Sequence, residues 1–147
     1  MYSAAIDDLV TELQTITEFS HTEDVPTVMR GEYGKLNVIK SKGCLVMPDF
    51  KNVPVNFPVG DGPIPKQLAF IANCFVITAQ HKTLVDAEDD VMLLADKVVQ
   101  KIEVKEFLFD MNDNKKYGKW EWTDIEWLDR SASLCVIALE FSINLQS

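Results

Sequence analysis

Residues 134–145 read LCVIALEFSINL, and no other stretch of the chain indicates its fold so clearly. Apolar side chains occupy every second position from Cys135 to Leu145, and from position 138 onward small or polar residues fill the positions between. Successive side chains of a β-strand point to opposite faces of a sheet, so this alternation predicts a strand with one buried face. We expect its other face to be wet or covered by a partner.

Working back from this strand, a short polar break at Asp129, Arg130 and Ser131 follows an apolar and aromatic stretch, which predicts a terminal antiparallel hairpin. Further strands are predicted where β-branched and aromatic residues gather in short runs. The predicted strands are Val25–Met29, Leu36–Ile39, Cys44–Met47, Leu68–Ala79, Lys119–Leu128 and Leu134–Leu145.

Two helices are predicted from apolar residues that recur every three or four positions. The first runs from about Ser3, a suitable N-cap, to Thr17. The second runs from about Asp86 to Ile102, with acids crowded into its first turn and lysines toward its end, as the helix dipole favours.

The chain has 147 residues, of which 47% are hydrophobic, and this is enough for one core. We therefore expect one α/β (α+β) domain covering residues 1–147, with a mixed, mainly antiparallel sheet flanked by two helices. The expected order is a helix, two or three short strands, a long strand, a second helix and a closing hairpin of two strands.

The segment from Pro48 to Pro65 holds five of the six prolines and predicts a long loop, at about residues 48–67. Long loops in small domains are usually functional or disordered, and this one is too apolar for a free linker. Its apolar residues are Phe50, Val53, Val55, Phe57, Val59 and Ile64. The loop packs either on a neighbouring subunit or, as an Ω-like loop, on its own core.

The formal net charge of −9 argues against a function that depends on broad electrostatic binding of DNA or RNA phosphates. No window of the sequence predicts a membrane span, and the acidic start does not resemble a secretory signal. Cys44, Cys74 and Cys135 each lie in an apolar run, which predicts buried free thiols in a reducing compartment.

No catalytic, metal or cofactor site is predicted. His21 and His81 have no ligand at metal-binding spacing, and glycine-rich phosphate loops and nucleophile elbows are missing from the sequence. Asp110, Asn112, Asn114 and Glu121 match the spacing of an EF-hand loop, but Lys115 stands where that loop needs glycine, so a polar turn is the better interpretation.

Three tryptophans lie close together before the last strand. In a regular strand Trp120 and Trp122 share one face and Trp127 points the other way, so at least one is expected near an interface or a sheet edge. The residues between them are mainly acidic, which favours contact with protein over stacking on nucleic-acid bases.

The order of these elements resembles the tail terminator proteins of tailed bacteriophages. The resemblance covers most of the chain and rests on the N-terminal helix AIDDLVTELQTI, the long strand FIANCFVIT, the helix DAEDDVMLLADKVVQKI and the final ASLCVIALEFSINL. It implies a hexameric ring that caps the tail tube at its head-proximal end, ends tail polymerisation and joins the tail to the head connector. The implied location is the virion tail or neck, after assembly in the host cytoplasm.

The implied partners are further copies of the chain, the tail tube protein, the connector protein and, in some tails, the sheath, while DNA only passes through an acidic lumen. A closed ring needs two different contact surfaces on each subunit. The candidate interface residues are Phe50, Val53, Val55, Phe57, Ile64, Trp120, Trp122 and Trp127. Two alternatives stay open, namely another neck, head-completion or baseplate component, and a small cytoplasmic enzyme or ligand-binding domain.

Overall fold

The computed structural model describes residues 2–31, 42–53, 67–111 and 114–145. Its helices are α1 (Tyr2–Leu13), the short 3₁₀ helix η1 (Thr17–Phe19) and α2 (Leu84–Glu103). Its strands are β1 (Val28–Arg30), β2 (Lys42–Val53), β3 (Gln67–Ala79), β4 (Phe107–Met111), β5 (Asn114–Gly118), β6 (Glu121–Arg130) and β7 (Leu134–Leu145).

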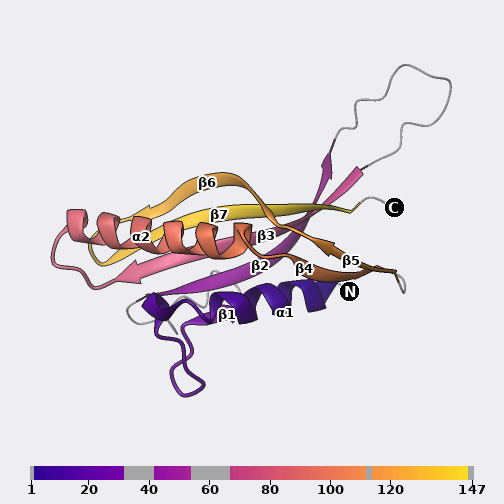
Figure 1. Ribbon diagram of the computed structural model, residues 1–147. Helices are drawn as coiled ribbons and strands as arrows, with labels where there is room; N and C mark the ends of the chain where they lie inside the picture. Colours follow the sequence, from indigo (N-terminus) through magenta and orange to yellow (C-terminus); the bar gives the residue numbers. More distant parts are fainter. Residues whose placement is uncertain (1, 32–41, 54–66, 112–113, 146–147) are drawn as a thin grey trace.

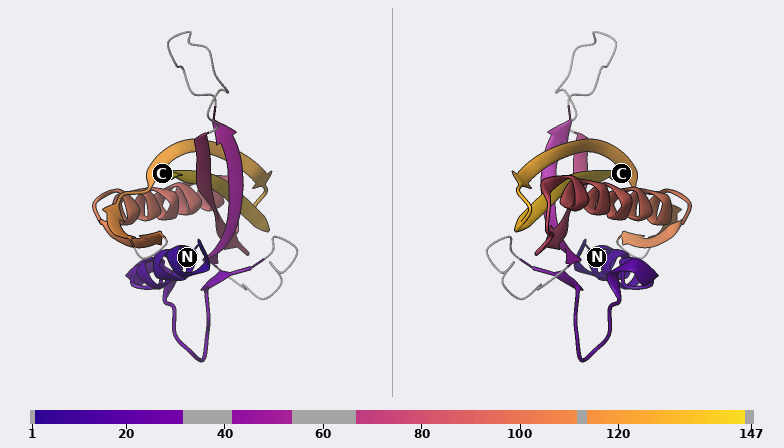
Figure 2. Two further views of the ribbon diagram at one scale, coloured as in Figure 1. Left: turned by 90° about the vertical axis from the view of Figure 1, so that its right-hand side faces the viewer. Right: turned by 90° about the vertical axis from the view of Figure 1, so that its left-hand side faces the viewer.

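Five strands form one mixed sheet in the order β1-β2-β3-β7-β6 (Figure 1). The β1–β2 pair is parallel, and the other pairs are antiparallel. This arrangement confirms the predicted mixed, mainly antiparallel sheet and the terminal hairpin, whose last strand has the predicted bounds. The views in Figure 2 show that the sheet is strongly twisted, since β2 and β3 stand steeply while β6 and β7 arch across them.

Both helices lie on the same face of the sheet (Figure 1). Helix α2 packs on β3, β7 and β6, whereas α1 packs on β1, β2 and α2. The main core lies between these layers and takes alternate residues from the strands, such as Val46, Cys74 and Leu139, with Leu9 and Leu94 from the helices. Cys44, Cys74 and Cys135 are buried and unpaired, as predicted.

The ends of both helices differ from the prediction. Helix α1 begins at Tyr2, so Ser3 is not its N-cap, and it ends at Leu13. Helix α2 begins earlier than expected because the Thr83 hydroxyl accepts a hydrogen bond of 3.2 Å from the backbone N–H of Asp86. Asp86 is consequently the single acid of its first turn.

The loop predicted from Pro48 begins later, because β2 continues through Pro48 as far as Val53. Strand β1 pairs with β2 only at residues 44–46, so Pro48 lies on an unpaired edge in the described part of the sheet. Proline is tolerated at an edge because no neighbouring strand needs its missing N–H group. Residues 54–66 and the predicted strand Leu36–Ile39 lie outside the described residues.

Where a polar turn was predicted after Phe109, strands β4 and β5 form a separate two-stranded hairpin. Asp110 and Asn114 lie on opposite strands of this hairpin, and Asp110 pairs with Lys115. An EF-hand loop would need these residues to wrap around one ion, so the hairpin excludes that alternative.

Strand β6 breaks the regular alternation that the sequence prediction assumed. Bulges between Trp122 and Asp124 and between Trp127 and Asp129 each add one residue to the strand. As a result Trp122 pairs with Phe141 and Trp127 with Ile137, and both of these partners belong to the core under α2. The prediction that Trp127 points away from Trp122 was wrong.

Candidate functional site

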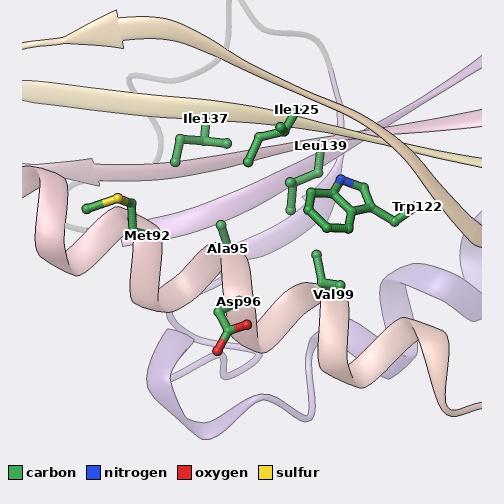
Figure 3. A pocket seen from close by; sticks show the side chains of 8 residues that line it. All are labelled: Met92, Ala95, Asp96, Val99, Trp122, Ile125, Ile137 and Leu139. Carbon is green, nitrogen blue, oxygen red and sulfur yellow. The ribbon is translucent and has the colours of Figure 1, made fainter.

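An apolar groove lies between α2 and β6 and has a volume of about 200 Å³. We call it the α2–β6 groove. Its lining side chains are Met92, Ala95, Asp96 and Val99 of α2, Trp122 and Ile125 of β6, and Ile137 and Leu139 of β7. Figure 3 shows the apolar side chains converging between helix and sheet, with the Asp96 carboxylate turned away from them.

The local structure of each element explains why these side chains meet. Positions 95 and 96 each lie three or four residues from both 92 and 99, so the four side chains share one side of α2. On β6, the bulge after Trp122 brings Trp122 and Ile125, three residues apart, onto the same face. The groove therefore depends on an irregularity that a simple two-residue period does not reveal.

The groove is open to solvent and exposes large apolar side chains. Exposure is 46% for Met92, 43% for Trp122 and 50% for Ile125. Apolar surface of this kind costs free energy in water, at about 25 cal/mol per Å², and contiguous exposed patches commonly mark interaction sites. Ligand pockets for drug-sized molecules measure roughly 300–1,000 Å³, so this shallow groove suits the side chains of a protein partner better.

One end of the groove is held by a charged contact between β6 and α2. The Nε and Nη2 atoms of Arg130 donate hydrogen bonds of 2.8 and 2.6 Å to Oε2 of Glu88. The same guanidinium lies over the ring of Trp127, 4.4 Å from its centroid. These contacts fix the spacing between strand and helix next to the groove.

Acidic side chains lie along the α2 side of the groove. On α2, Asp89, Asp96 and Glu103 are spaced seven residues apart, which places them along one side of the helix beside Met92 and Val99. On β6, the acids pair with residues of β7 that face away from the helices. These acids are Glu121, Asp124, Glu126 and Asp129. The β6 acids therefore lie on the other face of the sheet, and it is the acids of α2 whose potential beside the groove should favour a cationic partner.

The outer edge of β6 is protected against pairing with another strand. The Asp124 carboxylate accepts a hydrogen bond of 2.8 Å from the N–H of Ile125, and the Asp124 carbonyl accepts one of 2.9 Å from the indole N–H of Trp122. Two bulges twist the same edge. Bulges and charged side chains are the usual means by which proteins prevent edge strands from joining.

The free part of the β2 edge is protected in the same way. The N–H of Cys44 donates to Thr27 in the segment next to β1, so even-numbered residues of β2 direct their N–H groups to this edge. Pro48 has no N–H, and the N–H of Phe50 donates to its neighbour Asp49 at 2.8 Å. A partner would therefore meet few free donors along Pro48–Phe50.

A polar contact crosses the sheet face opposite the helices. Lys51 of β2 pairs with Glu140 of β7, although β3 lies between these strands, and Thr123 of β6 donates to Glu140 at 2.8 Å. Burial raises the pKa of the Glu140 carboxyl, but hydrogen bonds from Lys51 and Thr123 outweigh it, and the net pKa is lowered. The hydrogen bond to Glu140 raises the pKa of Lys51.

The structure places the candidate interface residues in different environments. Trp122 and Phe50 are exposed, at 43% and 47%, and Trp127 is partly buried against the core. Trp120 is only 1% exposed and packs on Phe70, with ring centroids 5.5 Å apart. The prediction that Trp120 belongs to an interface was therefore wrong, because this residue lies in the core. Val53 ends β2, while Val55, Phe57 and Ile64 lie outside the described residues.

The prediction missed the α2 side of the groove. Met92 and Val99 belong to an obvious amphipathic helix, and the width of its apolar stripe was the available signal. That stripe extends beyond the buried positions to Met92, which is 46% exposed. A helix whose apolar stripe is wider than its core contact leaves surface for a partner.

Within the described ranges, no group of three or more His, Cys, Asp or Glu side chains is arranged to hold a metal ion. His21 has a structural role, because its Nδ1 accepts hydrogen bonds from the N–H groups of Thr27 and Val28 at 3.1 and 3.2 Å. His81 lies 3.4 Å from an Asp90 oxygen, between the end of β3 and α2. In the part of the chain that the structure describes, no helix combines the length and apolarity needed to cross a membrane.

Comparison with models of known protein families and with curated proteins gives no match to this chain.

Proposed function

We propose that this protein is a structural component of a tailed bacteriophage that forms a ring at the head-proximal end of the tail. In this role it ends polymerisation of the tail tube and joins the tail to the head connector. The observation that carries the proposal is the open apolar α2–β6 groove, which exposes a contiguous apolar surface suited to contact with a protein.

The two edges of the sheet support a head-to-tail assembly. The groove lies at the β6 edge, and the other edge is formed by β1 and β2, with Phe50 exposed on β2. A ring closes through heterologous contacts, in which one surface of a subunit meets a different surface of the next. The chain offers such different surfaces at its two edges.

The charge at the β6 side of the remaining sheet face suits a lumen through which DNA passes. Asp124, Glu126 and Asp129 lie on the face opposite the helices, with Glu140 on the neighbouring strand. DNA phosphates are repelled by such a face, so DNA would slide past it without being retained.

Negative-stain electron microscopy of the purified chain tests this proposal. We expect rings with a central hole and one rotational symmetry, and the hexamer implied by the resemblance predicts six-fold averages. Particles of subunit size at every concentration, including after addition to tail tubes, would contradict it.

A small apolar ligand is the second candidate, because the groove offers about 200 Å³ of apolar space. A ligand-binding domain would stay monomeric and would bind a fluorescent apolar probe such as anilinonaphthalene sulfonate at one site per chain. Loss of that binding in a Trp122→Ala variant, with no ring in the wild type, would favour this alternative.

A further inference from the structure

We propose that the α2–β6 groove of one copy binds residues 35–42 of a second copy, the segment KLNVIKSK. The contact is head-to-tail and supplies the interface of the proposed ring, on which this inference rests. It names the segment that enters the groove and the physical basis of its recognition.

The groove requires a partner with two properties. Its exposed side chains, Met92, Trp122 and Ile125, need apolar groups to cover them. Its helix wall carries Asp89 and Asp96, which favour positive charge beside those apolar groups. The occupant should therefore combine aliphatic side chains with lysine or arginine.

Residues 35–42 have this composition. Lys35, Lys40 and Lys42 accompany Leu36, Val38 and Ile39, and no acid lies among them. A second lysine-rich stretch, NKKYGK at residues 114–119, has the same charge but a single aromatic residue, and most of it forms β5. In a chain with a net charge of −9, a segment with three positive charges and three aliphatic residues is the better complement to the groove.

The position of the segment favours a second copy over the same chain. It lies in the sequence between β1, which ends at Arg30, and β2, whose first residue is Lys42, the last residue of the segment. These two strands form one edge of the sheet, and β6 with its groove forms the opposite edge. A contact between opposite edges repeats from subunit to subunit, as a ring requires.

The protected strand edges indicate that side chains carry the contact. On β6, the Asp124 carboxylate already accepts the hydrogen bond of the Ile125 N–H. On β2, Pro48 has no N–H, and the N–H of Phe50 already donates to Asp49. Continuation of the sheet across subunits is therefore disfavoured, whereas the open groove accepts side chains without breaking these hydrogen bonds.

A synthetic peptide with the sequence of residues 35–42 tests recognition directly. We expect a saturable change in tryptophan fluorescence on titration into the purified chain, and weaker binding as salt is raised from 50 to 500 mM. A peptide with serine in place of Leu36, Val38 and Ile39 should bind at least about ten-fold more weakly, because the buried aliphatic area is lost. The NKKYGK peptide controls for charge alone.

Equal binding of the three peptides, or no saturable binding of the first, would overturn the proposal. The Trp122→Phe variant shows whether the fluorescence change comes from Trp122. In this variant the change should largely disappear, while calorimetry should still detect binding of the peptide. A change that persists in this variant would place the peptide elsewhere and would also overturn the proposal.

Two variants of the full chain test the contact in assembly. Ile125→Asp damages the groove, and Val38→Asp with Ile39→Asp damages the segment. Each should reduce the assembly to monomers, while an equimolar mixture should form dimers and nothing larger, because only one intact contact remains. Leu93→Asp is the matched control, since Leu93 and Ile125 are both 50% exposed but Leu93 does not line the groove.

Thermal unfolding of each variant shows whether it is folded, and Met92→Lys provides a second groove variant on α2 if Ile125→Asp is unstable. If both groove variants still form rings like those of the wild type, the groove contact is refuted and the proposed function stands. Specific peptide binding by a wild-type chain that never forms rings would instead support the groove contact and refute the ring.

Discussion

Arg130 should stabilise the protein by joining β6 to α2 at the end of the groove. Its two nitrogen atoms contact one Glu88 oxygen at 2.8 and 2.6 Å, and its guanidinium lies 4.4 Å from the ring centroid of Trp127. The Arg130 side chain is 55% exposed, so solvent screening limits the ion pair to about 0.5–1 kcal/mol. The contact with the tryptophan ring adds about 0.5–1 kcal/mol.

We therefore expect Arg130→Ala to lower the free energy of unfolding by about 1–2 kcal/mol. For a domain of this size that corresponds to a fall in Tm of roughly 2–8 °C. Urea titrations followed by circular dichroism, together with thermal scans, measure both quantities. Arg130→Lys should lose about half as much, since it keeps the charge but not the two-nitrogen contact.

A double-mutant cycle with Glu88→Gln separates the two contributions. The ion-pair part should appear as a coupling energy that shrinks in 0.5 M salt, while the contact with Trp127 should change little. Strictly additive effects of the two substitutions, or an Arg130→Ala loss below about 0.3 kcal/mol, would refute this account of how β6 is held.

Three further substitutions test other parts of the structure. Glu140→Gln should destabilise the protein at pH 7; because the folded-state pKa of Glu140 is lowered from 4.5, the difference from wild type should disappear in pH-dependent unfolding as the pH falls through that folded value. Leu94→Ala, in the core between α2 and the sheet, should cost about 2–5 kcal/mol in urea unfolding, and a loss below 1 kcal/mol would contradict its packed environment. Asp49→Ala should free the N–H of Phe50 and increase β-type aggregation, measured by thioflavin binding, whereas Lys51→Ala on the same strand should not do so by this route.

The main elements of the fold could be predicted because their patterns are local. The alternation in residues 134–145 gives β7 with its observed bounds, and the three- and four-residue spacing of α2 gives its buried face. The extension of β2 through Pro48 could not be predicted, because it depends on which part of the strand lies at an edge. That property belongs to the whole sheet and not to the local sequence.

The candidate site was less predictable than the fold. Trp122 was identified from its type and its acidic surroundings, but the bulge between Trp122 and Asp124 reverses the direction expected for Trp127. Trp120 precedes β6 and enters the core beside Phe70, which no spacing rule indicates. The groove arises where the helix and the bulged strand meet, so neither sequence segment shows it alone.

The central claim, assembly into a closed ring, is tested most directly by the mass of the purified chain in solution. Light scattering coupled to size exclusion, over a range of concentrations and salt, should give one discrete oligomer. Six copies of the 16.6 kDa chain have a mass of about 100 kDa. A constant mass of 16.6 kDa under all conditions, with no assembly after mixing with tail tubes, would contradict the account.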